Sequence, residues 1–194
     1  MKLITPDSLV RPSALRHFEK LGNFYLEPKI DGSWCLLIIE RKIKLISSGN
    51  REFAPGFVDQ QIMSSEFHPS LFGTKILCEL ETHTDWSTQR RRNRGFVICH
   101  NHTVVSFKNK DMTNIRYDKN KEILRDIASS FRDDLSRIFL TMPYVDKNFE
   151  ENYKEFKKEV CYEGAVLKNF SKDIIAPKNG RLKHWIKVKD FPSV

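Results

Sequence analysis

One lysine of this sequence stands where a side-chain amine could act as a nucleophile. Lys29 has a carboxylate two residues away on either side, at Glu27 and Asp31, and Gly32 then gives a turn signal. Apolar, strand-like sequence flanks this stretch on both sides. A lysine attacks only as the neutral amine, so its surroundings must lower its pKa by burial or by nearby positive charge. The alternative that these residues leave open is a hairpin with a solvated lysine.

Two later pairs of charged side chains fit the same kind of site. Glu79 and Glu81 are two residues apart in a strand-like run, so they share one face, and crowded carboxylates need cations to meet them. Lys187 and Lys189 also share one strand face, together with Trp185, and two cations there could converge on a phosphate. The alternative for each pair is an ordinary solvent-exposed strand face.

Five stretches occur in the order of the motifs of the covalent nucleotidyltransferases, which include DNA ligases, RNA ligases and mRNA capping enzymes. Each stretch alone is a weak signal, but five in one order are specific, and they span nearly the whole chain. The stretches that resemble the motifs are 26–34 with its K-x-D-G, 47–51 (SSGNR), 77–80 (LCEL), 163–168 (EGAVLK) and 185–189 (WIKVK).

This resemblance implies a function, cofactors and site residues. Lys29 would attack the α-phosphate of ATP, release pyrophosphate and keep a lysyl-AMP. Mg²⁺ would be held by Glu163, and Glu79 would contact the ribose or a metal ion. The remaining nucleotide contacts implied are Glu27 near the adenine amino group, Arg51 at the ribose or the 5′-phosphate of a nick, Phe96 stacked on the base, and Lys168, Lys187 and Lys189 offsetting the phosphate charge.

The resemblance also implies a fold. We expect an α+β chain with two antiparallel β-sheets flanked by helices, and the nucleotide in the groove between them, as in ATP-grasp-like ligase adenylation domains. We assign all of residues 1–194 to this one nucleotidyltransferase domain. Ligases of the family continue into an OB-fold domain, which we expect to be missing here, so that self-adenylation is slow and nick binding weak.

The motifs point to more than one nucleic acid. The basic run 85–94 and the stretch 111–124 resemble segments of ATP-dependent DNA ligases, and Arg90, Arg91, Arg92 and Arg94 suit backbone phosphates. Against this, Ser33 follows the motif glycine as in many RNA ligases, and Trp34 stands where DNA ligases usually carry arginine. We expect a DNA ligase core that seals nicks in duplex DNA. The alternatives are an RNA ligase or RNA-repair enzyme, and a binding module without chemistry.

Composition adds limits on partners and location. The chain has 194 residues, a formal net charge of +8 and a pI near 9.3, which favours phosphate-rich partners. Its four cysteines form no C-x-x-C pair, so we expect reduced thiols in an intracellular protein, located in the cytoplasm, the nucleoid or an infected host cell. We also expect the chain to be a monomer. The sequence shows neither a signal peptide nor a membrane-spanning stretch, and no membrane partner is expected.

Apolar periodicity predicts the elements that position these residues. Ser13 is expected to cap the first helix and Gly22 to end it, and residues 99–102 are expected to form a turn between two strands. The predicted helices are 12–22, a segment within 57–67, 117–131 and 149–160, and the predicted strands lie within 23–47 and at 75–82, 95–99, 103–107, 137–141, 163–168 and 184–189.

Overall fold

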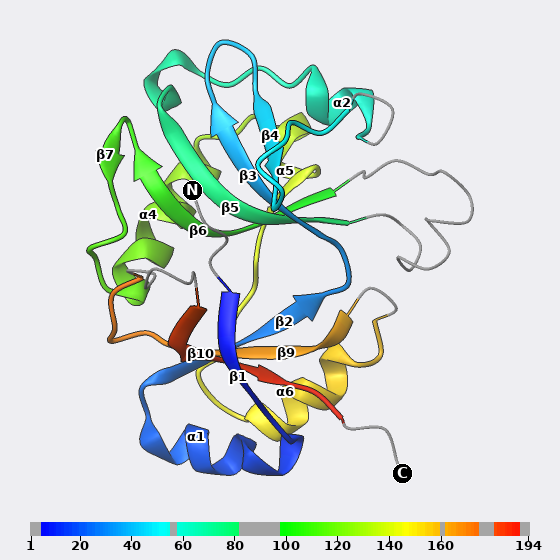
Figure 1. Ribbon diagram of the computed structural model, residues 1–194, viewed down its shortest axis with the longest axis vertical. Coiled ribbons are helices and arrows are strands. Elements are labelled where there is room, and N and C mark those ends of the chain that lie inside the picture. Colours follow the sequence, from blue (N-terminus) through cyan, green and yellow to red (C-terminus); the bar gives the residue numbers. More distant parts are fainter. Residues whose placement is uncertain (1–4, 55–57, 82–97, 160–161, 175–180, 191–194) are drawn as a thin grey trace.

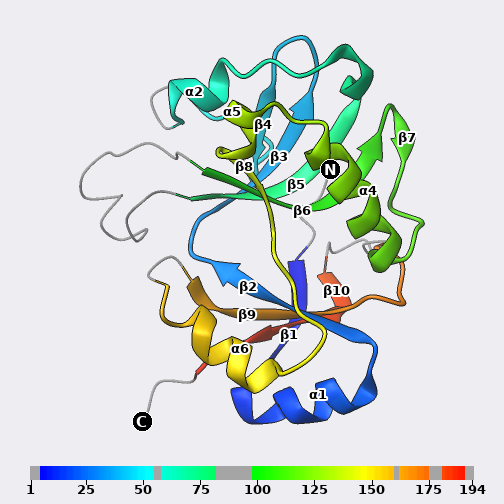
Figure 2. The same cartoon turned by 180° about the vertical axis from the view of Figure 1, so that it is seen from behind.

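The computed structural model describes residues 5–54, 58–81, 98–159, 162–174 and 181–190. Their strands form two β-sheets, one above the other in Figure 1, and helices cover the outer side of each sheet (Figure 2). The prediction of an α+β chain with two sheets flanked by helices is therefore confirmed. Within the described residues, no helix is long and apolar enough to cross a membrane.

The lower sheet carries most of the residues singled out in the sequence. Its strands, in spatial order, are β1 (Thr5–Val10), β10 (Arg181–Val188), β9 (Tyr162–Asn169) and β2 (Phe24–Ile30). The helices α1 (Leu15–Leu21) and α6 (Phe149–Phe156) pack beneath it, and their apolar side chains bury Leu26 and Leu167. Gly22 ends α1 with φ 67°, as expected, whereas Ser13 makes no capping hydrogen bond because the chain enters α1 through a 3₁₀ turn at Pro12–Ala14.

The upper sheet has the order β4–β3–β5–β6–β7, with β8 beside β6. Its strands are β3 (Ser33–Ile39), β4 (Lys44–Ser47), β5 (Thr74–Glu81), β6 (Ile98–Phe107), β7 (Lys110–Asp111) and β8 (Phe139–Thr141). The helices that accompany it are α2 (Gln60–Met63), α4 (Tyr117–Ser129) and α5 (Asp133–Ser136), with a 3₁₀ turn at Pro69–Leu71. Contrary to the expectation of purely antiparallel sheets, β1 pairs with β10 and β8 with β6 in parallel.

The turn after Lys29 carries the chain from one sheet to the other. The strand β2 pairs with β9 in the lower sheet, whereas β3 pairs with β4 and β5 in the upper sheet, so the two strands do not form a hairpin. Gly32 lies where this crossing passes close to β5. A Cβ there would collide with the carbonyl oxygen of Leu80 and would lie 2.9 Å from Cγ of Glu79. Glycine is needed for close approach of the backbone, which holds Lys29 against the upper sheet.

Gly32→Ala is expected to lower the free energy of unfolding by about 1–3 kcal/mol, because overpacking forces the backbone or Glu79 to move. Gly49→Ala is the matched control, since the nearest atom to its added Cβ would be Oγ of Ser47, at 4.0 Å. Urea unfolding of both variants measures the difference. Two variants of equal stability would show that the close approach at Gly32 does not contribute to the free energy of unfolding.

The expected turn at residues 99–102 is wrong. The strand β6 runs without interruption through these residues, but its register on β5 shifts, because Leu77 pairs with Thr103 and the next residue, Cys78, pairs with Asn101. His102 is therefore the extra residue of a β-bulge. Such bulges re-aim a side chain without ending the strand. The polar run Cys99–His102, which reads as a turn in sequence, is thus buried as part of a continuous strand.

Candidate functional site

A pocket of about 170 Å³ opens between the two sheets. Both sheets contribute to its wall, which places it at the groove predicted from the sequence. The lower sheet supplies Glu27, Lys29, Val166, Lys168, Trp185 and Lys187, and the upper sheet supplies Trp34, Glu79 and His102. A concave site with a few converging charged groups on an apolar wall is typical of a small-molecule site.

The reactive end of the pocket is built around Glu163. Its carboxylate forms ion pairs with both Lys29 and Lys189, one through each oxygen. Gly164 lies opposite Lys29 in the register of β9 and β2, with φ 145°. A Cβ at this glycine would collide with the carbonyl oxygen of Val188, so its absence lets the end of β10 approach β9. That approach brings Lys189 onto the same carboxylate as Lys29.

Burial and charge shift the pKa values at this end of the pocket. Burial, with the positive charge of Lys189 and Lys187 adding to it against the opposing charge of Glu79, lowers the pKa of Lys29 to about 8. Burial raises the pKa of Glu79 to about 8, although the charge of Lys29 acts against the shift. A lysine with a pKa near 8 is neutral in roughly a tenth of the molecules at pH 7, compared with well under a thousandth for an ordinary lysine. This is the condition that a lysine nucleophile must meet.

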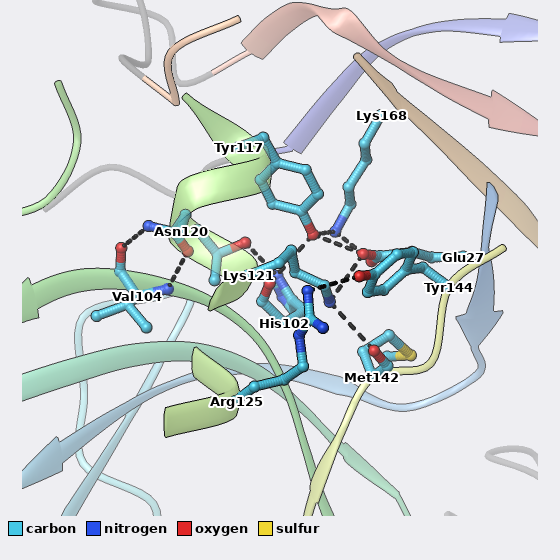
Figure 3. A network of polar contacts seen from close by, with 11 residues as sticks. Glu27, His102, Val104, Tyr117, Asn120, Lys121, Arg125, Met142, Tyr144 and Lys168 are labelled. Atoms are coloured by element: carbon cyan, nitrogen blue, oxygen red, sulfur yellow. Dashed lines mark hydrogen bonds and ion pairs between the residues drawn. The ribbon is translucent and has the colours of Figure 1, made fainter. Parts of the chain in front are cut away.

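The other end of the pocket holds a buried charge network, shown in Figure 3. Glu27 is 1% exposed, and its carboxylate lies 2.6 Å from Nζ of Lys168 and 2.9 Å from Nζ of Lys121. The hydroxyl of Tyr117 donates a third hydrogen bond to Glu27 over 2.6 Å. Burial alone would raise the pKa of Glu27, but the two lysines outweigh it and lower that pKa, so the carboxylate is ionised. Burial lowers the pKa of Lys168 to about 8.

Two members of this network, Tyr117 and Lys121, were not predicted as site residues. Both lie on α4, and a sequence signal for them exists. The buried residues of α4 are Tyr117, Asn120, Lys121, Leu124 and Ile127, so the lysine lies on the apolar stripe of the helix. A lysine in that position must find an anion or a carbonyl group. Lys121 finds both, because it also donates to the carbonyl oxygen of Met142 at 3.1 Å.

His102 lies in the wall of the pocket and was also missed. The bulge in β6 turns its ring inward, where it is 8% exposed. Burial, together with the positive charge of Lys168 and Lys121 and a smaller effect of His100, lowers the pKa of His102 well below its usual value. The ring is therefore neutral in the folded protein at neutral pH.

This pKa shift predicts how stability depends on pH. Above pH 6.5 both the folded and the unfolded states carry a neutral His102, whereas below it only the unfolded state binds the proton. The free energy of unfolding should then fall by about 1.4 kcal/mol per pH unit on account of this residue. His102→Phe removes the effect, so between pH 6.5 and pH 5 the variant should lose about 2 kcal/mol less than the parent in urea titrations. Parallel stability curves for the two proteins would contradict a depressed pKa at His102.

Comparison with solved structures places this arrangement among known folds. The mycobacterial DNA ligase D complexed with ATP aligns over 97% of this chain and 59% of its own, with a TM-score of 0.66 and 16% identity. The Chlorella virus DNA ligase-adenylate aligns over 98% of this chain and 69% of its own, with a TM-score of 0.63 and 14% identity. The ATP-dependent DNA ligase of bacteriophage T7, in complex with ATP, gives a TM-score of 0.59 over 97% of this chain and 68% of its own, at 13% identity.

This chain has the fold of the ATP-dependent DNA ligases. The likeness confirms the resemblance found in the sequence motifs at the level of fold. The chain spans 59% and 57% of the length of the two mycobacterial ligase structures. No protein-family model and no curated protein sequence matches it.

The ligase-fold pocket gathers most of the predicted site residues. Glu27, Lys29, Glu79, Lys168 and Lys187 line it, and Glu163 and Lys189 meet Lys29 at its edge. Arg51 is not part of the lining found among the described residues, because it lies on the exposed turn after β4. Five predicted residues lie outside the described part of the chain, namely Phe96, Arg90, Arg91, Arg92 and Arg94.

The described residues contain no group of three or more His, Cys, Asp or Glu side chains that could hold a metal ion by itself. Mg²⁺ rarely needs such a group, since it is commonly bound by one or two carboxylates together with substrate phosphates. Glu163 supplies oxygen donors of that kind at the Lys29 end of the pocket, and Glu79 supplies them once it releases the proton that its raised pKa of about 8 retains. The residues present therefore fit a magnesium ion that is bound jointly with a triphosphate.

Proposed function

We propose that this chain is the nucleotidyltransferase core of an ATP-dependent DNA ligase, which seals nicks between a 5′-phosphate and a 3′-hydroxyl. One observation carries the proposal: Lys29 lines the pocket together with Lys187 and Glu79. At the edge of the pocket, the carboxylate of Glu163 forms ion pairs with both Lys29 and Lys189. The ligase fold and the order of the five motifs support it. Two of the similar ligase structures are complexes with ATP, which supports ATP as the substrate.

In the first step, the neutral amine of Lys29 attacks the α-phosphorus of ATP. A nitrogen–phosphorus bond forms, the oxygen bridge between the α- and β-phosphates breaks, and pyrophosphate leaves with the electron pair. The attacking nitrogen gives up a proton to solvent water, and the product is a lysyl-AMP phosphoramidate. The AMP then passes to the 5′-phosphate at the nick, which gains a leaving group for attack by the 3′-hydroxyl.

Each charged group around Lys29 has a part in this step. Lys187 and Lys189 lie beside the nucleophile, where their charge both favours its neutral form and offsets the negative charge on the phosphates. Glu163 pairs with Lys189 as well as with Lys29, so its carboxylate keeps a cationic partner when the amine of Lys29 is neutral. A magnesium ion, when bound by Glu163 and Glu79, supplies charge stabilisation for the pentacoordinate phosphorus and the leaving pyrophosphate.

The positive charge of the chain suits a polyanionic second substrate. The formal net charge is +8, and the arginines at 90, 91, 92 and 94 follow the strand that carries Glu79. Arginine forks bind phosphate oxygens in pairs and make binding depend steeply on salt. Nicked duplex DNA is the substrate we propose, with the chain acting as a monomer inside the cell.

The experiment that tests the nucleic-acid part uses pre-adenylated nicks, because sealing them needs no ATP step. Matched nicked duplexes of DNA and of RNA are incubated with the chain and Mg²⁺, and ligated strands are separated on denaturing gels. Sealing of the DNA nick at the higher rate supports the proposal. Preferential sealing of the RNA nick would identify an RNA ligase instead, and sealing of neither would contradict the ligase assignment.

A further inference from the structure

His102 has one ring nitrogen engaged by the protein and one left for the pocket. Its Nδ1 lies 3.0 Å from Oγ1 of Thr103, the next residue of the bulge. Among the described residues, Nε2 makes no hydrogen bond that the structure records, while the ring lines the pocket at 8% exposure. Whether this free nitrogen accepts or donates a hydrogen bond depends on which nitrogen carries the proton.

The buried network settles the direction of the hydrogen bonds that lead to His102 (Figure 3). Glu27 is an ionised acceptor between two lysines, so the proton of Tyr117 points to it over 2.6 Å rather than to the carbonyl oxygen of His102 at 3.1 Å. The phenol oxygen of Tyr117 is therefore left to accept. Lys168 donates to it at 3.0 Å.

Thr103 is the link between Tyr117 and His102. Burial, then the charge of Glu27, raises the pKa of Tyr117 well above its usual value, so the phenol keeps its proton. A hydrogen bond with Thr103 acts in the opposite direction on this pKa. Because the proton of Tyr117 is directed to Glu27, the phenol oxygen can only accept, so Thr103 is the donor in this hydrogen bond. With its proton turned toward Tyr117, the Thr103 oxygen accepts from Nδ1–H of His102. The neutral ring then has its only proton on Nδ1 and a lone pair on Nε2.

We infer that His102 selects adenine over guanine, by accepting a hydrogen bond at Nε2 from the exocyclic amino group of the base. This inference rests on the proposed function, which places a nucleotide in the pocket. Adenine presents an amino donor at C6, whereas guanine presents a carbonyl acceptor there. Two acceptors that face each other leave both unpaired, which typically costs roughly a 10- to 100-fold loss in affinity. Glu27 is less available for this role, because three donors of the protein already occupy its carboxylate.

The first arm of the test measures binding without chemistry. Calorimetry without divalent metal compares ATP, GTP and purine riboside triphosphate, which lacks any group at C6, on the full chain and on His102→Phe. The parent should prefer ATP over purine riboside triphosphate by about 10-fold, and the phenylalanine variant should bind the two within about 2-fold. A ring that only stacks on the base would keep the parent's ratio in His102→Phe, which would overturn the inference.

The second arm reads the tautomer directly in the free protein. Nitrogen-15 NMR of histidine-labelled chain distinguishes a protonated ring nitrogen from an unprotonated one. We expect His102 to be protonated at Nδ1 alone, and Thr103→Val, which removes the hydroxyl at nearly constant volume, to populate the other tautomer and reduce the ATP preference. A ring protonated at Nε2 in the parent would overturn the inference. A chain with the expected tautomer that binds no nucleotide would instead contradict the proposed function.

Discussion

Lys29→Arg is expected to abolish AMP transfer from ATP, with a loss on the order of 10⁶-fold, the scale reached when a covalent nucleophile is removed. Arginine keeps the positive charge that pairs with Glu163, but its guanidinium stays protonated and cannot attack phosphorus. Transfer of radiolabelled AMP to the protein, followed on denaturing gels, measures the effect. The folded state should be preserved, because the ion pair is retained.

The control for this variant is Lys44→Arg. Lys44 pairs with Glu40 at 2.8 Å on the protein surface and lies on β4, away from the pocket. Its replacement should leave AMP transfer within about 2-fold of the parent, since exposed ion pairs contribute little. Substantial labelling of Lys29→Arg would mean that another residue carries the AMP, and the assignment of the nucleophile would fail.

Glu27→Ala is expected to lower the free energy of unfolding by about 3–5 kcal/mol, the typical cost of leaving a buried charge without its partner. The change removes the anion between Lys121 and Lys168, which are 1% and 4% exposed, so two cations would share one buried site. Urea unfolding at pH 7 measures the loss. Nucleotide binding should weaken as well, because Lys168 lines the pocket.

Two further variants test whether the loss in Glu27→Ala comes from the buried charges. Glu40→Ala removes a carboxylate from a surface ion pair and should cost at most about 1 kcal/mol. Replacing Glu27, Lys121 and Lys168 together with methionine should recover much of the stability, since apolar side chains of similar volume can substitute for a buried ion cluster, but it should not recover nucleotide binding. A loss below 1 kcal/mol in Glu27→Ala would show that the two lysines find other partners or deprotonate without cost.

The sequence identified the reactive end of the site because its residues lie within short motifs. Lys29 and Lys187 share one face of the lower sheet through strand alternation, because Val166 pairs with both Glu27 and Lys187. Glu163 belongs to one of the motifs, but it lies at the irregularity in the register of β2 and β9, so alternation alone does not bring it to Lys29. The helix 117–131 was predicted nearly to its end for a similar reason, since its apolar stripe recurs at helical spacing.

The crossing at Gly32, the bulge at His102 and the contact of Lys121 could not be predicted in the same way, because they depend on pairing between distant segments. The crossing at Gly32 reads as a hairpin in sequence, and only the pairing of β2 with β9 reveals two sheets. The bulge at His102 arises from a one-residue shift against β5, which composition does not encode, and a polar run there is typical of a turn. Lys121 becomes a site residue only through its contact with Glu27, which lies 94 positions earlier in the chain.

Intact mass spectrometry shows whether Lys29 becomes covalently linked to AMP from ATP. The chain is incubated with Mg²⁺ and, in separate tubes, with ATP, GTP or NAD, and the modified protein is digested to locate the adduct. We expect an AMP adduct from ATP alone, mapped to Lys29 and lost on mild acid treatment, as for a phosphoramidate. An adduct on another residue, or no adduct from ATP in a chain that calorimetry shows to bind it, would rule out Lys29 as the residue that carries AMP.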